Sequence, residues 1–295
     1  IFAEMFDDGT SGAAFAIAND SRPVSMVSNG SAGHQVMIIS GNLLYIYDLT
    51  ADTLTNITTN IYNPARWGEF MDGYFLLYQG SDSRAFQWSA LEDGTSWDAL
   101  DVAERSIASD GINGFVRVGR ALWILGGRTS EVWYDDGVTP FAPIQGVFIE
   151  HGCQATATVK RADNTLIWLG IDSDGRGVVF KADGYTPRRI STTAVEKDLH
   201  AADIPTDAAA FVVQIQGHYY YVLVLPRDLT TSWVYDLSRE RWYEWAHWDS
   251  TACEWFPFRP WVAANCWNLN LVGDRSTAGI YEFTPDVLAD ELVDV

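Results

Sequence analysis

Basic side chains are scarce in this sequence of 295 residues. It holds 19 Lys and Arg against 39 Asp and Glu, which gives a formal net charge of −20. A protein that clamps nucleic acid needs a surplus of positive charge to displace the counterions of the phosphates. The composition therefore excludes tight wrapping of DNA, whereas a surface that repels DNA and lets it slide past remains physically possible.

Cysteine and paired histidine are also rare. The three cysteines, Cys153, Cys253 and Cys266, stand far apart, and the five histidines show neither HxxxH nor HxH spacing. An odd number of cysteines without a CxxC pair argues against a disulfide framework and favours reduced thiols. Residues 171–177 resemble the start of a calcium loop but lack its third acid and its downstream Glu, so they predict a hairpin turn. We expect no metal site and no cofactor.

Long apolar runs are absent. No stretch approaches the roughly 18 apolar residues that a membrane-spanning helix requires. Residues 1–10 lack the basic start and the long apolar core of a secretory signal peptide. The first residue is not Met and the sequence stops at "ELVDV", so we expect a fragment of a longer chain.

Apolar and aromatic residues are abundant, at 47% hydrophobic content with 13 Trp. A short pattern recurs among them: an apolar stretch, an aromatic residue, a polar residue and then a turn. Its aromatic residues are separated by 41, 46, 46, 55 and 46 positions, a period typical of β-propeller blades. These six residues are Tyr47, Trp88, Tyr134, Phe180, Tyr235 and Tyr281.

Most copies of the pattern follow another strand-like run that begins at a tight turn, as at residues 72–80 and 217–225. We predict an all-β fold, a single β-propeller domain over residues 1–295 with six blades of antiparallel strands. The approximate blades are residues 24–60, 63–104, 112–146, 152–200, 205–250 and 253–290.

One interval is longer than the others, and it contains the best helical segment. Residues 191–203 are rich in helix formers, and Thr193 and Glu196 have the spacing of a capping box. We therefore predict one short helix inserted between two blades.

Carboxylates follow the aromatic residue in several copies, as Asp48, Asp135, Asp236 and Glu282. A catalytic acid occurs once or twice in a protein, whereas an acid repeated at one strand end is typical of turn chemistry. The sequence therefore predicts no catalytic residue. The alternative is a glycan-binding or glycan-cleaving propeller, which would need acids from different blades within about 5–10 Å of each other.

Two features suggest contact surfaces. Aromatic residues crowd residues 245–261, including Trp245 and Trp248, where core packing, a partner interface and sugar stacking are the alternatives. Arg188 and Arg189 form the one Arg-Arg pair, which could anchor an acidic neighbouring subunit or form an exposed basic turn. These four residues are the candidate interface residues.

The amino-acid sequence of the second half is similar to that of a known family. The segments "DNTLIWLGID", "FKADGYTPRRISTTAVEKDL", "SWVYDLSRERWYEW" and "ANCWNLNLVGDRSTAGIYEF" resemble the packaged-DNA stabilisation protein of P22-like short-tailed phages, a tail accessory or tail hub protein. The likeness covers most of residues 119–283, whereas residues 1–70 match in general character only. The family chain is longer, with a further C-terminal region.

The resemblance implies a virion structural protein and not an enzyme. It implies a homohexameric ring below the portal and adaptor rings, with the tail needle or other tail proteins as further partners. DNA would be retained in the head and later pass through the ejection channel without tight binding. The expected location is the virion tail, after assembly in the cytoplasm of the bacterial host. The family has no catalytic residues to carry over.

Overall fold

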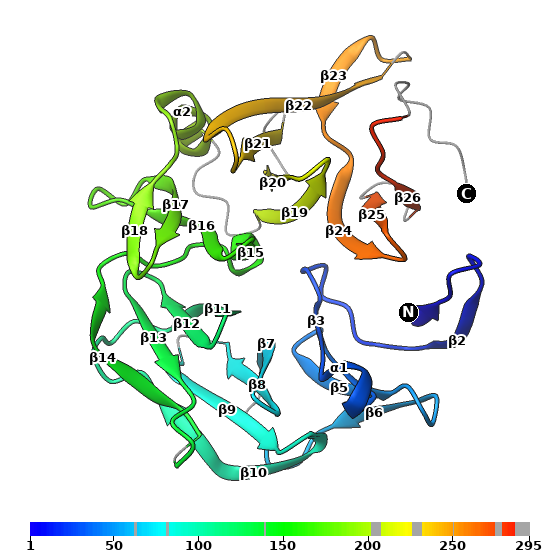
Figure 1. The fold of residues 1–295 in the computed structure, drawn as a ribbon, viewed down its shortest axis with the longest axis vertical. Coiled ribbons are helices and arrows are strands. Elements are labelled where there is room, and N and C mark those ends of the chain that lie inside the picture. Colours follow the sequence, from blue (N-terminus) through cyan, green and yellow to red (C-terminus); the bar gives the residue numbers. More distant parts are fainter. Residues whose placement is uncertain are drawn as a thin grey trace. The chain divides into compact units, whose positions relative to one another are not determined.

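The structure is a computed structural model (Figure 1). It describes residues 1–286 except 62–63, 81–82, 139, 202–207, 226–231, 250 and 275–278. Its contacts divide the chain into two compact units, Ile1–Cys153 and Gln154–Val295. The single domain over residues 1–295 stays a prediction.

The first unit contains a two-stranded sheet followed by three four-stranded sheets. Every strand is antiparallel to its neighbours, and strand order follows the sequence within each sheet. The two-stranded sheet consists of β1 (Phe2–Met5) and β2 (Ser11–Phe15). The others consist of β3 (Ser25–Ser28), β4 (Gln35–Ser40), β5 (Leu43–Asp48) and β6 (Thr53–Ile57); β7 (Ala65–Met71), β8 (Tyr74–Gln79), β9 (Ala85–Ala90) and β10 (Asp93–Glu104); and β11 (Ile112–Val118), β12 (Ala121–Gly126), β13 (Ser130–Tyr134) and β14 (Ala142–Ile149).

The second unit contains sheets of four, five and three strands with the same antiparallel order. They consist of β15 (Lys160–Ala162), β16 (Thr165–Ile171), β17 (Gly177–Asp183) and β18 (Thr186–Arg189); β19 (Ala209–Ile215), β20 (His218–Val224), β21 (Ser232–Asp236), β22 (Arg241–Asp249) and β23 (Glu254–Pro257); and β24 (Pro260–Cys266), β25 (Leu269–Asp274) and β26 (Ile280–Glu282).

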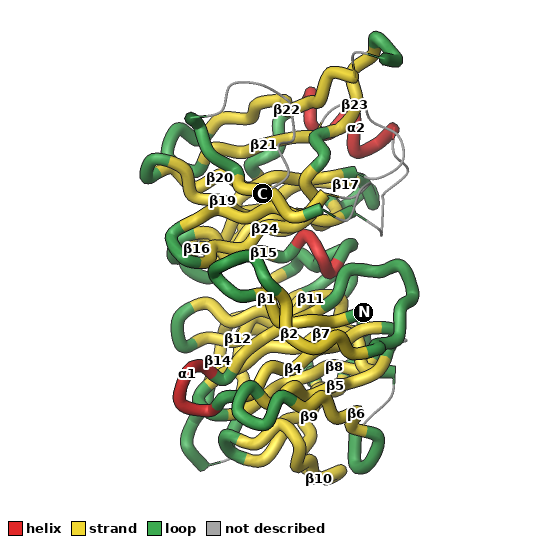
Figure 2. The backbone as a smooth tube through the Cα atoms, turned by 90° about the vertical axis from the view of Figure 1, so that its right-hand side faces the viewer, coloured by secondary structure: helices red, strands yellow, loops and turns green. Residues whose placement is uncertain are grey.

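Six sheets of three to five consecutive antiparallel strands are the blades of a six-bladed β-propeller. Figure 2 shows how far strands dominate the described chain. The predicted all-β propeller fold is confirmed.

Each aromatic residue of the recurring pattern lies in the third strand of its blade, in β5, β9, β13, β17, β21 and β26 in turn. The blade hairpins use turn residues that tolerate a positive φ. Asp72 and Gly73 (φ 48° and 91°) join β7 to β8, and Gln216 and Gly217 (φ 50° and 84°) join β19 to β20. Two successive positive φ angles match the right-handed twist of the flanking strands, so the turn sets the register of the hairpin.

The recurrent acids accept hydrogen bonds from the turns that follow them. Asp48 Oδ1 accepts from the N–H groups of Thr50 and Ala51, at 2.8 and 2.9 Å. Asp236 Oδ1 accepts from the N–H groups of Ser238 and Arg239, at 2.8 and 3.1 Å. Asp135 and Asp136 bond to the N–H groups two residues ahead of them in the same way. The predicted turn chemistry is confirmed for these acids.

The predicted helix is present as α2 (Thr193–Ala201), but its predicted capping box is wrong. The Glu196 carboxylate accepts hydrogen bonds from the Ser191 hydroxyl and the Arg189 guanidinium. A charged guanidinium is a stronger donor than a backbone N–H, so the Glu196 carboxylate bonds to Arg189 and not to the N–H at the start of the helix. A second helix, α1 (Gly30–Gly33), is a single turn that the sequence did not predict.

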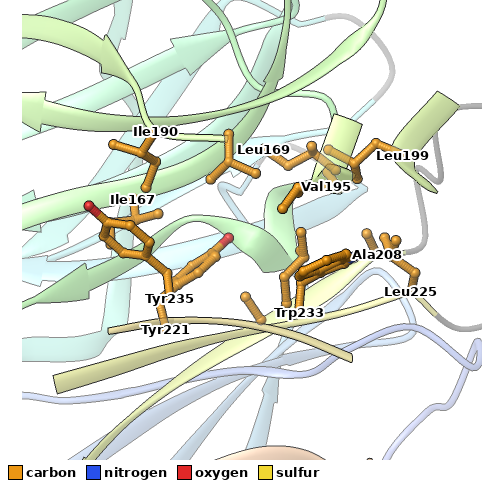
Figure 3. Packing of buried hydrophobic residues seen from close by; sticks show 14 of the residues in the cluster. Ile167, Leu169, Ile190, Val195, Leu199, Ala208, Tyr221, Leu225, Trp233 and Tyr235 are labelled. Carbon is orange, nitrogen blue, oxygen red and sulfur yellow. The ribbon is translucent and has the colours of Figure 1, made fainter. Parts of the chain in front are cut away.

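Successive blades pack face to face within each unit. In the second unit, Leu169 of β16, Tyr221 of β20 and Trp233 of β21 share one buried cluster with Val195 and Leu199 of α2 (Figure 3). In the first unit, similar clusters join the first blade to the second and the second to the third. Because both faces of the central strands are covered, a strand such as β9 is buried along its four middle residues.

Candidate functional site: a buried polar network and an exposed aromatic groove

Within the described part of the chain, no group of three or more His, Cys, Asp or Glu side chains is placed to hold a metal ion. The segment that resembled a calcium loop is the turn between β16 and β17. Asp172 Oδ1 there accepts hydrogen bonds from the N–H groups of Asp174 and Arg176, both at 2.9 Å. The predicted hairpin turn is confirmed. No helix among the described residues has the length and apolar character to cross a bilayer.

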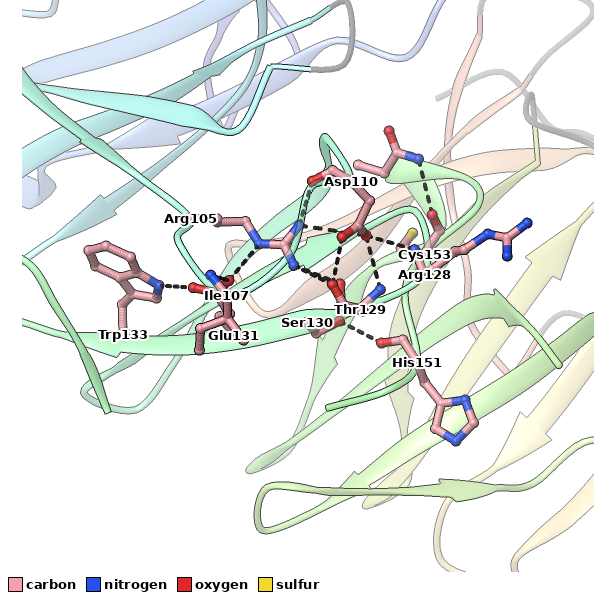
Figure 4. Close-up of polar contacts among 11 residues, drawn as sticks. Arg105, Ile107, Asp110, Arg128, Thr129, Ser130, Glu131, Trp133, His151 and Cys153 are labelled. Atoms are coloured by element: carbon pink, nitrogen blue, oxygen red, sulfur yellow. Dashed lines mark hydrogen bonds and ion pairs between the residues drawn. The ribbon is translucent and has the colours of Figure 1, made fainter. Parts of the chain in front are cut away.

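The first candidate site is a buried ionic network beside β13 (Figure 4). The side chains of Arg105 and Glu131 are fully buried, and Arg105 Nε lies 3.5 Å from Glu131 Oε1. The same guanidinium donates to the carbonyl and the hydroxyl of Thr129, at 3.1 and 2.7 Å. Trp133 Nε1 donates to Glu131 Oε2 at 3.1 Å, so a core indole and a core cation share one carboxylate.

Asp110 is the second acid of this network. Its Oδ2 lies 3.7 Å from Arg105 Nη1, and it accepts hydrogen bonds from the N–H groups of Arg128 and Thr129. Burial alone would raise the pKa of Asp110. The two N–H donors, the Thr129 hydroxyl and the Arg105 charge outweigh burial and hold that pKa below its ordinary value. Asp110 is therefore ionised at neutral pH.

Two glycines leave room for this network. A Cβ on Gly126 would lie 2.0 Å from Arg105 Nη1 and 2.2 Å from Asp110 Oδ2. A Cβ on Gly152 would lie 2.3 Å from the carbonyl oxygen of Gly126, which accepts the Cys153 N–H at 2.7 Å. The network thus fastens the β10–β11 connection to the β12–β13 hairpin. The side chains of Arg105 and Glu131 have no access to solvent.

Sequence reasoning missed this network and considered only the acids that follow the recurring aromatic residues, Asp135 among them. A signal was present, because Glu131 and Trp133 are two residues apart and share one face of a strand. The burial of Trp133 therefore requires that Glu131 be buried too, and a buried carboxylate requires a cation.

The predicted interface arginines both have acidic partners within the chain. Arg188 Nη2 lies 2.8 Å from Glu240 Oε1, which also pairs with Lys181 at 3.4 Å. Arg189 forms a two-pronged pair with Glu196 of α2 through its Nε and Nη2 atoms. Both side chains remain about half exposed.

Trp245 and Trp248 lie on β22, which continues past β21 and pairs with β23 in a hairpin that extends beyond the rest of its sheet (Figures 1 and 2). Trp245 is partly buried, and its ring lies 5.2 Å from Phe258 and 5.6 Å from Phe283 in edge-on contacts. Trp248 is 40% exposed and packs edge-on against Trp255, which is 55% exposed. The structure brings the two predicted tryptophans onto one hairpin, apart from the arginine pair in sequence and in partners.

The second candidate site is a groove of ≈ 630 Å³ on this hairpin. Its lining is aromatic except for one carboxylate and one small residue. The lining residues are Glu244, Trp245, Ala246, Trp255, Phe258 and Phe283. Sequence reasoning found most of the aromatic residues of this region, but not Phe283, which reaches the groove from the far end of the sixth blade.

A family comparison covers nearly the whole chain. The model of the family described as "Bacteriophage P22 Gp10, beta-propeller" matches residues 6–288. The chain belongs to this family. The predicted resemblance is therefore confirmed, and it extends into the N-terminal residues that matched only in general character. Members of this family are bacteriophage structural proteins that stabilise packaged DNA in the virion.

Comparison with solved structures bears on the fold. A chain of a mitotic checkpoint complex is 13% identical with a TM-score of 0.54, covering 91% of this chain and 79% of its own length. The extracellular domain of a putative one component system from B. thetaiotaomicron is 11% identical with a TM-score of 0.53. The match covers 90% of this chain and 33% of that one, so the present chain spans about one third of its length.

An auxiliary nutrient binding protein from Bacteroides thetaiotaomicron VPI-5482 is 11% identical with a TM-score of 0.51, covering 85% of this chain and 66% of its own. At such identities the likeness concerns the fold alone. No curated protein matches the chain. None of these comparisons supports the glycan-binding or glycan-cleaving alternative.

Proposed function

We propose that this family member is a non-catalytic part of the phage tail hub. It would form a homohexameric ring below the portal and adaptor, retain the packaged DNA and line the path of ejection. The observation that carries this proposal is the family match over residues 6–288 on a six-bladed propeller.

The charge of the chain supports a passage that does not hold DNA. A net charge of −20 repels the phosphates of DNA. DNA can therefore move past such a surface without exchanging its counterions for basic side chains. The buried network of Arg105, Glu131 and Asp110 supports a structural role, because these charged groups pair with one another inside the protein.

The exposed side chains support a protein partner. Aromatic residues are enriched at protein interfaces, and the β22–β23 hairpin exposes Trp248, Trp255 and Phe256 together. The half-exposed pair of Arg188 and Arg189 is a second candidate contact, where a neighbour would compete with Glu240 and Glu196 for the guanidinium groups.

Electron microscopy of the full-length protein mixed with its portal–adaptor assembly tests the proposal. The expected result is a ring of six copies in line with the adaptor, with an open channel along the axis. Monomers that leave the adaptor bare would contradict it.

A further inference from the structure

We propose that the groove on the β22–β23 hairpin binds the guanidinium of an arginine presented by a partner protein. That the occupant is a protein rests on the proposed function. The preference of the groove for a guanidinium rests on its own residues.

The aromatic part of the groove is preorganised. The rings of Trp245, Phe258 and Phe283 contact one another with centroids 5.2 to 5.6 Å apart. These three residues come from β22, from the β23–β24 connection and from the residue after β26, and their shared core holds them in place. Trp255 stands at the rim and remains 55% exposed, so a ligand can cover its ring.

The polar part of the groove is negative. Glu244 is exposed and is the one ionisable residue among the lining residues. Asp249 and the exposed Glu254 are paired across β22 and β23 on the same hairpin and do not line the groove. The N–H groups of Ala252 and Thr251, and then the charges of His247 and Arg259, hold the pKa of Asp249 below its ordinary value. Neither His247 nor Arg259 lines the groove.

A groove lined by aromatic residues and one acidic residue fits a cation better than the alternatives. The face of a tryptophan ring carries negative charge density and attracts a cation. A guanidinium can stack on that face while its N–H groups donate to a carboxylate in the same plane, which the compact ammonium of a lysine cannot do. An apolar side chain in the groove would desolvate Glu244 without pairing it. A sugar would find a single polar group to bond.

The test uses the whole chain labelled with 5-fluorotryptophan, with the signals of Trp245 and Trp255 assigned from their Trp→Phe variants. The probes are three capped tripeptides, Gly-Arg-Gly, Gly-citrulline-Gly and Gly-norleucine-Gly. Citrulline keeps the shape of arginine without its charge, and norleucine offers an apolar chain. Fluorine NMR titration then gives the affinity of each peptide.

The expected result is that the arginine peptide shifts both signals saturably and binds ~5-fold to 10-fold more tightly than either neutral peptide. Glu244→Gln and Trp255→Ala should each weaken arginine binding by ~5-fold or more. The matched control Trp267→Ala removes a tryptophan of similar exposure, 46%, in the β24–β25 turn and should change nothing.

Three outcomes would overturn the inference: equal affinity for arginine and citrulline, tighter binding of norleucine, or no shift of either signal with arginine. Unchanged arginine affinity in both variants would do the same. Each of these leaves the ring and its DNA retention untouched, so the failure of this inference and of the proposed function can be told apart.

Discussion

At the scale of single residues, the chain places an ionic network inside a blade. Arg105 is surrounded by Glu131, Asp110 and Thr129, and Glu131 also accepts the indole N–H of Trp133. Removing one partner of a buried pair leaves the other charge without water or a counterion, which costs about 3–5 kcal/mol. The members of the network therefore depend on one another.

Arg105→Met should lower the free energy of unfolding by about 3–5 kcal/mol, because Glu131 stays buried without its cation. Urea unfolding followed by circular dichroism measures the loss. The control is Arg84→Met, whose exposed pair with Glu104 should contribute at most about 1 kcal/mol. Equal stability of the two variants would show that the buried pair adds nothing.

Gly126→Ala should be destabilised by about 1–3 kcal/mol, because the new methyl group overlaps Arg105 Nη1 and Asp110 Oδ2. The neighbouring Gly127→Ala is a matched control, since its Cβ would meet only Asn113 Nδ2 at 3.6 Å. Thermal melting of both proteins makes the comparison. A larger loss for Gly127→Ala would mean that the network can move aside.

Acid should weaken the network through Asp110. The folded state lowers the pKa of Asp110 below that of the unfolded chain, so the resulting stability is complete above about pH 4 and is lost as pH falls through the folded-state pKa. The difference in unfolding free energy between the natural protein and Asp110→Asn should be constant from pH 7 to 5 and shrink below pH 4. A difference that grows on acidification would show that folding raises the pKa of Asp110.

At the scale of elements, the six third strands were predictable because each repeats one local pattern before a turn. Trp133 and Trp233 lie in two of these strands and are 5% and 6% exposed. The ionic network was not predicted because its members come from a connection, a hairpin and a strand that only folding brings together. The aromatic groove was found in part, since Phe283 joins Trp245 only through the packing of the sixth blade against the fifth.

Trp133→Ala and Trp233→Ala should each cost about 3–5 kcal/mol, because each removes a buried indole that packs between two blades. Each indole also donates a hydrogen bond, to Glu131 and to Asp198. Chemical denaturation gives the values, with the exposed Trp267→Ala as the reference. Native-like stability of both core variants would mean that the faces of β13 and β21 are reversed.

At the scale of the whole molecule, composition and repeat length predicted the six-bladed propeller. Sequence segments of the second half predicted the family. Both follow from local patterns in the sequence. The ring, its partners and the tail position depend on contacts between chains, which no pattern within one chain encodes. They therefore stand as proposals.

The most direct test is DNA retention by phage heads that have been filled but lack this protein. The full-length protein is added to such heads with their portal and adaptor, nuclease is applied, and the protected DNA is measured. The account predicts that protection rises with added protein to a plateau near six copies per head. Unchanged nuclease sensitivity at saturating protein, with the protein bound, would contradict it.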